Sequence, residues 1–431
     1  MTKLSLTLWR VALLLLAGLL SWRILATNLA AYYADRLQAG DRDAVEHLLT
    51  WQPDHPRALF AQGTRLAAAD PEAALETLAR AYRANPTDPQ PLLAIAALYI
   101  KQERTEDADA LMRIADRLTP VDPSVQQQLA VYWDRRGDTP AALQHLSKAM
   151  AAHPRYRPEN YPVMLGLAED PALRALLEPV ALESPAWWPG FFRYAADKAR
   201  STEVVRYLFD LGRRAAGDSL TEDEQLAYQN RLLRDGFAVE AYLAWLNTLE
   251  PAARKQLGLL FNGGFELPLS NAGFDWRTRP HKQLDIRPLR TLGTSGAASL
   301  MVRFNGFDER FNHLSQVLLL QPGPYRLSGA ARVDDLKTHG GVRWQVRCRG
   351  TGNKILGESQ VFLGAAEWGE FSFDFEVPGS DCNTQELRLV SAGTHNFELA
   401  IDGVLWFDNL RIERTVGLDA AAGADHAPDT R

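Results

Sequence analysis

The chain has 431 residues, with 47 Lys and Arg against 53 Asp and Glu and a formal net charge of -6. This length allows two or three domains. The near balance of charge argues against a function based on bulk attraction to nucleic acid, so no nucleic-acid partner is expected. Outside the first thirty residues the composition is that of an ordinary globular protein.

The N-terminus reads "LSLTLWRVALLLLAGLLSWRILA", in which Arg10 and Arg23 frame twelve uncharged residues. Thirteen helical steps place the Cα atoms of these arginines about 20 Å apart. Their long side chains can extend outward, and Trp9 and Trp22 beside them suit the membrane interface, so a hydrocarbon core of about 30 Å can be crossed. We therefore predict a transmembrane anchor over residues 1–34.

A cleaved signal peptide is the alternative interpretation of this segment. Cleavage is disfavoured because Asn28 stands where a small residue is wanted in both candidate sites, Ala26-Thr27-Asn28 and Asn28-Leu29-Ala30. Lys3 and Arg10 favour a cytoplasmic N-terminus. The expectation is a single-pass protein of a bacterial inner membrane, with its C-terminal domains in the periplasm.

Prolines supply a repeat period in the next part of the chain. Pro53, Pro86, Pro120 and Pro154 are separated by 33, 34 and 34 residues. A fixed period in this range predicts stacked pairs of helices. Small residues at helical spacing are expected to let the paired helices approach closely. These residues are Ala96, Ala108, Ala115, Ala142 and Ala149.

This pattern resembles the tetratricopeptide repeat, most closely over residues 89–154 and more loosely over 55–86. Beyond residue 160 the period fades, although a helix pair with a turn at Gly236 is still predicted. The resemblance implies a helical repeat domain over residues 35–255, with a concave surface for a protein partner. A plain helical solenoid without a ligand is the alternative.

Four aromatic residues crowd around a Pro-Gly pair in "SPAWWPGFF", at residues 184–192. They are Trp187, Trp188, Phe191 and Phe192. Such a cluster either faces a membrane or a partner, or lies buried between helix pairs, which is the commoner outcome beside a proline.

After Asn262 the hydrophobic period changes from that of helices to that of strands. "GVRWQVRC" and "EFSFDFEV" alternate apolar and polar residues, and "YRLSGAARV" and "ELRLVSA" behave similarly. Short alternating strands separated by Gly and Pro predict an antiparallel β-sandwich. The alternation places Trp344 in the core, and Arg343, Gln345 and Arg347 on the polar face.

The motifs "NGGFE", "FDWR", "GAASLMVRF", "QPGPYRLS", "WGEFSFDFEVP" and "GVLWFDNLRI" resemble the jelly-roll, galactose-binding-like carbohydrate-binding modules of xylanases and related glycanases. The resemblance covers residues 258–414. It implies that the glycines of "NGGFE" permit a tight crossing, that Phe265 fills the core and that Glu266 faces the closing strand. The small, polar residues 415–431 are expected to be a disordered tail.

The same resemblance implies binding sites. Glu266 and Asp408 match acids that commonly help to hold a structural calcium ion in the family; otherwise they satisfy backbone amides, and no other cofactor is expected. Sugar-binding aromatics stack on pyranose rings. The main candidates are Trp276 and Trp368, which lie near loops, and Tyr325; Trp406 is a further candidate, and Trp344 is one that the alternation places in the core. The polar residues Arg343, Gln345 and Arg347 can hydrogen-bond a glycan or an acidic sugar, or they form a solvated face.

Cys348 ends one predicted strand and Cys382 precedes another. In an exported domain a disulfide between them is the natural interpretation, with two free thiols as the alternative. The nine histidines are dispersed, and phosphate-binding loops and nucleophile motifs are absent from the sequence. No enzyme is therefore expected.

Together these features predict a multidomain α + β protein: a transmembrane helix, a tetratricopeptide-like solenoid and an antiparallel jelly-roll sandwich. The expected role is that of a non-catalytic accessory protein in exopolysaccharide or surface-glycan assembly, which recruits protein partners through the repeats and contacts polysaccharide through the sandwich. A pure protein scaffold that binds no sugar is the alternative. A third class, a glycan-modifying enzyme, requires a cleft of converging acids.

Overall fold

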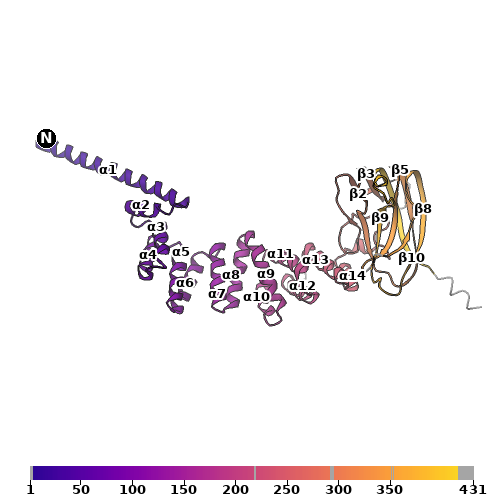
Figure 1. Cartoon of the computed structure of the whole chain (residues 1–431), viewed down its shortest axis with the longest axis horizontal. Helices are drawn as coiled ribbons and strands as arrows, with labels where there is room; N and C mark the ends of the chain where they lie inside the picture. Colours follow the sequence, from indigo (N-terminus) through magenta and orange to yellow (C-terminus); the bar gives the residue numbers. More distant parts are fainter. Residues whose placement is uncertain (1–2, 218–219, 292–295, 351, 353, 416–431) are drawn as a thin grey trace, which may run out of the picture. The chain divides into compact units, whose positions relative to one another are not determined.

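A computed structural model of the protein describes residues 3–415 except 218–219, 292–295, 351 and 353. The chain forms two compact units, Met1–Trp188 and Pro189–Arg431 (Figure 1). Of the tail expected at 415–431, residues 416–431 lie outside the described residues.

The first unit is built from paired helices. They are α1 (Lys3–Gln38), α2 (Ala44–Trp51), α3 (Pro56–Leu66), α4 (Pro71–Ala84), α5 (Gln90–Lys101), α6 (Thr105–Leu118), α7 (Pro123–Arg135), α8 (Thr139–Ala152), α9 (Arg157–Glu169) and α10 (Leu177–Leu182), with 3-10 turns η1 (Pro154–Tyr156) and η2 (Arg174–Leu176). Consecutive helices pack in pairs from α1 and α2 to α7 and α8. Pro53, Pro86, Pro120 and Pro154 each follow the second helix of a pair, which confirms the repeat period.

Small residues bring the paired helices together, as predicted. Ala96, Ala108, Ala115 and Ala149 are fully buried. Several helices begin at an aspartate that accepts backbone amides, as Asp122 does from Ser124 and Val125 at the start of α7. Such a cap stabilises a helix by about 1 kcal/mol.

Helix α1 combines two roles along its length. Its stretch Val11–Gln38 is long and apolar enough to span a membrane, and it fits a signal sequence equally. The apolar side chains from Val11 to Leu25 are exposed to solvent. From Ala30 onward the same helix packs against Val45 and Leu48 of α2. The apolar segment therefore runs without a break into the first helical repeat.

The second unit begins with further helices: α11 (Trp188–Lys198), α12 (Thr202–Ala216), α13 (Glu222–Arg234), α14 (Ala238–Leu246) and the short α15 (Pro251–Arg254). Gly236 has a φ of 87° between α13 and α14, which confirms the predicted turn. The aromatic residues Trp187, Trp188, Phe191 and Phe192 are all buried. This cluster is therefore core and not a surface patch.

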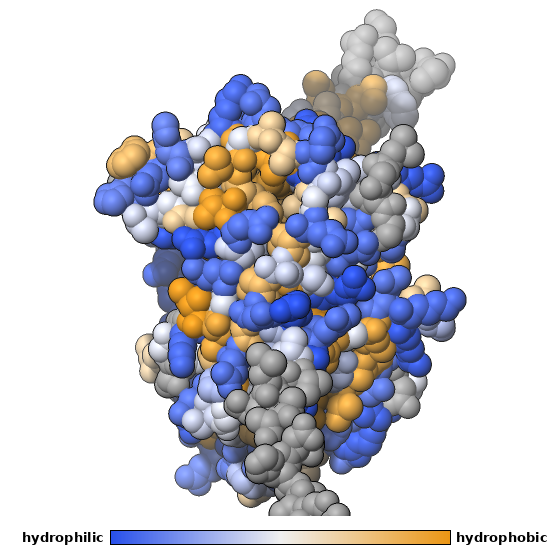
Figure 2. All heavy atoms as spheres, turned by 90° about the vertical axis from the view of Figure 1, so that its right-hand side faces the viewer, coloured by the Kyte–Doolittle hydropathy of each residue, from blue (hydrophilic) through white to orange (hydrophobic). Residues whose placement is uncertain are grey.

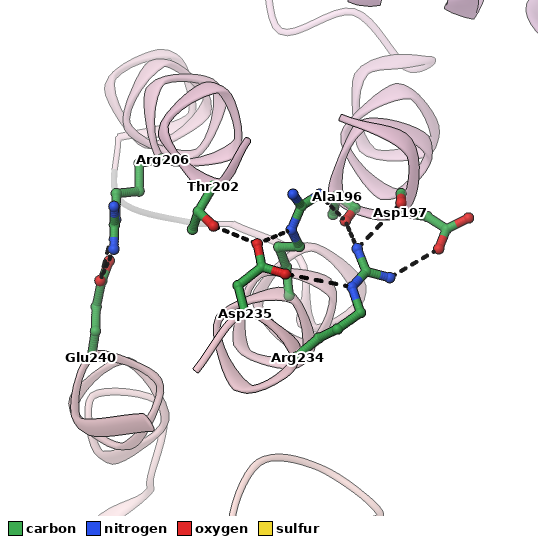
Figure 3. Close-up of polar contacts among 8 residues, drawn as sticks. Ala196, Asp197, Thr202, Arg206, Arg234, Asp235 and Glu240 are labelled. Carbon is green, nitrogen blue, oxygen red and sulfur yellow. Dashed lines mark hydrogen bonds and ion pairs between the residues drawn. The ribbon is translucent and has the colours of Figure 1, made fainter. Parts of the chain in front are cut away.

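A polar network ties α11 to α14 together (Figure 3). Asp235 accepts hydrogen bonds from Thr202 Oγ1 and, at 2.6 Å, from Arg231 Nε. Arg231, whose side chain is only 5% exposed, also donates to Ala196 O at 3.1 Å. Burial raises the pKa of Asp235, but the hydrogen bonds from Thr202 and Arg231 outweigh it and hold the pKa below its usual value. Asp235 is thus the counter-ion of a buried guanidinium.

We predict that Asp235→Asn lowers the free energy of unfolding by about 3 kcal/mol, because it leaves the buried Arg231 charge uncompensated. The control Asp223→Asn breaks an ion pair whose side chains are 57% and 65% exposed, so it should cost less than about 1 kcal/mol. Denaturant unfolding measures both variants.

The Asp235 contribution has a defined pH dependence. Since the folded pKa is lowered, the stabilisation is complete above the unfolded value of about 3.9 and is lost as pH falls through the folded pKa. The difference between wild type and Asp235→Asn should therefore shrink in acid. A difference independent of pH would contradict an ionic role.

The rest of the second unit is a sandwich of two five-stranded antiparallel sheets. Sheet A has the order β1 (Arg277–Thr278), β4 (Leu314–Leu318), β9 (Gln385–Ser391), β6 (Val342–Cys348), β7 (Ile355–Glu358). Sheet B has the order β2 (Leu284–Arg290), β3 (Ala298–Phe307), β10 (Ile401–Arg414), β5 (Gly323–Thr338), β8 (Gly364–Val377). A turn, η4 (Asn396–Glu398), precedes β10. This arrangement confirms the predicted jelly-roll sandwich.

Aromatic and aliphatic side chains from both sheets form one core between them. Trp344 of β6 is fully buried there, as the alternation predicts, and its ring contacts Phe407 of β10 at a centroid distance of 5.1 Å. On the face shown in Figure 2, hydrophobic residues lie in several separate areas between hydrophilic ones. Such interspersion is usual for a surface in contact with water.

The "NGGFE" segment crosses the closing strand β10. Leu410 donates its amide to Gly263 O at 2.9 Å, and a Cβ at Gly263 would lie 1.9 Å from Leu410 O. Asn262, with a φ of 48°, fixes the loop through side-chain hydrogen bonds of 3.0 and 3.2 Å to the backbone of Leu267. Phe265 is fully buried in the core. The tight crossing and the core plug are both confirmed.

We predict that Gly263→Ala destabilises the sandwich by about 2–4 kcal/mol, because its methyl group overlaps a backbone carbonyl that cannot move freely. Gly264 is the matched control, since the nearest atom to its Cβ would be 3.9 Å away. Gly264→Ala should change stability by less than about 1 kcal/mol. Equal losses from both alanines, measured by thermal unfolding, would contradict the crossing.

A disulfide between Cys348 and Cys382 joins the end of β6 to the segment before β9, with Cα atoms 5.2 Å apart. This confirms the predicted pairing. The bridge closes a loop with a sequence separation of 34, and a loop of this size is stabilised by about 3–4 kcal/mol through lost unfolded-state entropy.

The last helix pair packs directly on the sandwich. Trp245 of α14 meets Phe261 edge to face at 5.0 Å and Phe274 at 5.6 Å between ring centroids. Gly273, with a φ of 53°, lies so close that a Cβ there would be 2.0 Å from the Trp245 ring. Helix α14 thus packs through Trp245 on aromatic side chains of the segments that precede the first strand of the sandwich.

Candidate functional site

The outer face of sheet A carries the three polar residues that the alternation of β6 singles out. Arg343, Gln345 and Arg347 lie opposite Val390, Arg388 and Glu386 of β9. On the next strands of the sheet, Gln345 is opposite Glu358 of β7, and Arg388 is opposite Ser315 of β4. A polar row therefore crosses the sheet. We call the following residues the sheet A face: Arg277, Arg343, Gln345, Arg347, Arg349, Glu358, Glu386 and Arg388.

Hydrogen bonds hold these side chains in fixed positions. Arg343 Nη1 donates to Glu358 Oε2 at 2.7 Å, and Gln345 Nε2 donates to Glu358 Oε1 at 2.6 Å. Gln345 Oε1 in turn accepts from Arg388 Nε at 2.9 Å. Arg347 Nε donates to Glu386 Oε2 at 2.7 Å. The ion-paired side chains are only 17–32% exposed, so they are partly buried on the face of the sheet.

Three arginines of this face lack a carboxylate partner. Among the described residues no ion pair is made by Arg277, Arg349 or Arg388, in contrast to Arg343 and Arg347. Burial is the largest effect and lowers the pKa of all three; the neighbouring Arg347 or Arg349 charges lower it further, and the Glu386 charge raises it only in part. The sheet A face thus has more positive than negative charge.

Two of the three aromatic candidates for sugar stacking were predicted wrongly. Trp276 is fully buried, with its ring 5.3 Å from Phe265 and its Nε1 donating to Asn262 O at 3.1 Å. Tyr325 is 3% exposed, and its hydroxyl donates to Gln321 O at 2.8 Å. A ring enclosed by the core offers no face to a sugar, so both residues are structural.

The third candidate, Trp368, lies half-buried on the outer face of sheet B. Arg332 lies between its ring and that of Trp406, with Cζ 5.9 and 5.3 Å from the two ring centroids. Asp334 accepts from Trp406 Nε1 at 2.8 Å and from Arg332 Nε at 2.9 Å. We call Trp368, Trp406, Arg332 and Asp334 the tryptophan patch. It lies on the other sheet from Arg343, Gln345 and Arg347, so the predicted sugar-binding residues do not form one site.

The two expected calcium ligands are both engaged with the backbone. Glu266 Oε1 accepts from the amides of Ala297 and Ala298 at 2.8 and 3.3 Å, at the start of β3, rather than facing the closing strand as expected. Asp408 is 1% exposed and accepts the Asn409 amide at 2.7 Å. No group of three His, Cys, Asp or Glu placed to hold a metal is found in the described part of the chain. A calcium ion held by Glu266 and Asp408 together with backbone carbonyls stays a prediction.

The first unit offers a groove between helices α5 and α7, with a volume of about 600 Å³. Its apolar wall includes Leu93, Ala97 and Val131, and Arg135 and Arg136 line it as well. Val131 is 44% exposed. This groove is a candidate site for a peptide of a protein partner.

Sequence reasoning missed Arg277, Arg349 and Arg388. Arg388 was detectable, because "ELRLVSA" alternates and places it on the polar side of its strand. Its position opposite Gln345 depends on strand pairing. Arg277 lies on the two-residue strand β1, which is too short to show any alternation.

Comparison with known proteins covers both parts of the chain. Residues 65–131 match the family model of the tetratricopeptide repeat. No curated protein matches the sequence. The solved structure "CBM4 structure and function" has 13% identity and a TM-score of 0.27, over 36% of this chain and 99% of that chain.

Two further solved structures are similar over the same share. The CBM22-1 xylan-binding domain from Paenibacillus barcinonensis Xyn10C has 15% identity and a TM-score of 0.26, over 35% of this chain and 91% of that one. TmCBM61, in complex with beta-1,4-galactotriose, has 19% identity and a TM-score of 0.26, over 37% and 99%. The family-model match thus lies in the helical part of the chain, and each of these solved structures is similar to a little over a third of the chain.

We predict that Trp276→Ala destabilises the protein by about 3–5 kcal/mol, as expected for loss of a buried aromatic side chain. Trp368→Ala, on the outer face of sheet B, should cost less than about 1 kcal/mol. Chemical denaturation distinguishes the two. A Trp276 variant of normal stability would show that this ring is not part of the core.

Proposed function

We propose that this protein is a membrane-tethered, non-catalytic accessory protein that binds polysaccharide through the sheet A face and a protein partner through the helical repeats, in exopolysaccharide or surface-glycan assembly. The observation that carries the proposal is the partly buried, hydrogen-bonded polar row across β7, β6 and β9. Its side chains are already held by one another, from Arg343 through Glu358 and Gln345 to Arg388.

Such a row suits a sugar ligand for a physical reason. Sugar hydroxyls need donors and acceptors in fixed directions, and a preorganised surface loses little side-chain entropy when it binds. Guanidinium groups present several donors in one plane. Gln345 is only 5% exposed, so it fixes Glu358 and Arg388 on either side more than it contacts a ligand itself.

The protein-binding part of the proposal rests on the α5–α7 groove. Its mixed lining, apolar at Leu93 and Val131 and cationic at Lys101 and Arg135, suits a peptide with apolar and acidic side chains. The match to the tetratricopeptide repeat over residues 65–131 supports this role.

The proposed location is the periplasmic side of a bacterial inner membrane. Helix α1 is apolar and long enough to serve as the tether. The Cys348–Cys382 disulfide supports an oxidising compartment for the sandwich.

A catalytic role is not proposed for the sheet A face. Glu358 accepts hydrogen bonds from Arg343 and Gln345, and Glu386 accepts from Arg347. Both carboxylates are thus occupied by ion pairs within the face itself.

The tryptophan patch favours the alternative function, a scaffold whose sandwich binds protein. Trp and Arg are the residues most enriched at the centres of protein interfaces. Trp368 Nε1 is buried and has no hydrogen-bond partner among the described residues, so a protein ligand that brings an acceptor would satisfy it.

The test uses the full chain in detergent, with affinity electrophoresis through gels containing neutral or acidic bacterial polysaccharides. The double variant Arg343→Ala/Arg347→Ala should weaken binding at least tenfold, equivalent to about 1.4 kcal/mol. The control is Arg326→Ala, which removes an exposed ion pair with Asp374 on sheet B and should bind normally. If only Trp406→Ala loses binding, the polysaccharide site lies at the tryptophan patch and not on the sheet A face. If no polysaccharide retards the protein in the gel, the alternative function of a protein-binding scaffold is favoured.

A further inference from the structure

The sheet A face contains five guanidinium groups and two carboxylates. The carboxylates Glu358 and Glu386 pair with Arg343 and Arg347, which leaves an excess of three positive charges. These belong to Arg277, Arg349 and Arg388. Each is partly buried, where an unpaired charge is costly unless something neutralises it.

The partners that these three arginines do have are neutral. Arg388 donates to the amide oxygen of Gln345 at 2.9 Å. Arg277 donates to Asn230 Oδ1 and to Gly273 O, both at 3.0 Å, and its Nε is buried with no hydrogen-bond partner among the described residues. Arg277 Nε is itself enclosed, so the donors that remain for an anion from outside the chain are the other guanidinium N–H groups of the three arginines that have no partner among the described residues.

The three charges are close enough to act on one ligand. Arg349 continues the pairing of β6 with the chain at β9, since its amide donates to Thr384 O at 2.9 Å, and, in addition to burial, its charge lowers the pKa of Arg277. Arg277 on β1 and Arg388 on β9 are separated by β4, so they are about 10 Å apart at two interstrand spacings. A ligand that satisfies all of them carries several negative groups in a row.

We propose that the sheet A face binds an anionic polysaccharide, with Arg277, Arg349 and Arg388 receiving its oxyanion groups. This assignment rests on the proposed function of the sandwich as a polysaccharide-binding domain, and it names the class of polymer. A carboxylate is planar and accepts two parallel N–H bonds from one guanidinium, so a polymer of uronic acids fits this chemistry. Sulfate esters supply the same charge and are a separate arm of the test.

The test measures binding of the full chain in detergent to polygalacturonate and to its methyl-esterified form, which has the same backbone without the charge. Biolayer interferometry should give at least tenfold tighter binding to the charged polymer. That preference should weaken as salt is raised, because exposed charge interactions are screened. Dextran sulfate and dextran form the second pair.

The variants are Arg349→Gln and Arg388→Gln, with Arg326→Gln on sheet B as the matched control. Each sheet A variant should lose at least tenfold in affinity for the charged polymer, whereas the control should keep it. In the absence of ligand, thermal unfolding of the sheet A variants should be unchanged or shifted upward, because a poorly compensated charge has been removed. A lower unfolding temperature would show that these arginines support the fold, which overturns the assignment.

The outcomes separate this inference from the proposed function. If the chain binds polygalacturonate and its ester equally, and Arg343→Ala/Arg347→Ala loses this binding, the sandwich binds polysaccharide but has no preference for anionic polymers. This result would overturn the inference and leave the proposed function standing. No binding to any polymer would overturn both. Binding of dextran sulfate in place of polygalacturonate, lost in Arg388→Gln, would support an oxyanion site and assign it to sulfate esters.

Discussion

The backbone crossing of Gly263 and Leu410 is the constraint on which the second unit depends. At this point the chain leaves its helices, and the opening segment must pass so close to the closing strand that no side chain fits. The same few residues place Phe265 in the core and give Trp276 its hydrogen-bond acceptor at Asn262. Because Phe261 and Phe274 flank this segment and pack on Trp245, the crossing also positions helix α14 against the sheets.

The rigid backbone of the sandwich also fixes the side chains on its outer surface. The strands β6, β9 and β4 are held in register by a full core and by the disulfide at Cys348. Their outward side chains can therefore be kept at positions that are electrostatically unfavourable in isolation. The arginines of the sheet A face are such a case, since stability alone would favour neutral side chains there. A ligand that supplies the missing negative charge explains why this arrangement is useful.

Much of the architecture could be predicted from the sequence, because helices and strands each produce a local period in the hydrophobic residues. The proline spacing predicted the helix pairs, and the alternation in "GVRWQVRC" predicted that Trp344 lies in the core. The two cysteines predicted the disulfide between them. The candidate site was less predictable. Trp276 and Tyr325 are buried, and proximity to a loop, which favoured Trp276 as a candidate, does not show whether a ring points inward. Arg277, Arg349 and Arg388 meet only through the pairing of strands far apart in sequence, which local patterns do not encode.

The most direct test of this account is hydrogen exchange of the full chain, followed by mass spectrometry, with and without the polysaccharide that binds it best. The account predicts slower exchange in peptides covering residues 342–349 and 385–391, which form the middle of the sheet A face. Peptides from 326–334 and 401–408, which carry most of the tryptophan patch, should be unchanged. Protection confined to these latter peptides, or to the helical repeats, would contradict the claim that sheet A presents the polysaccharide-binding surface.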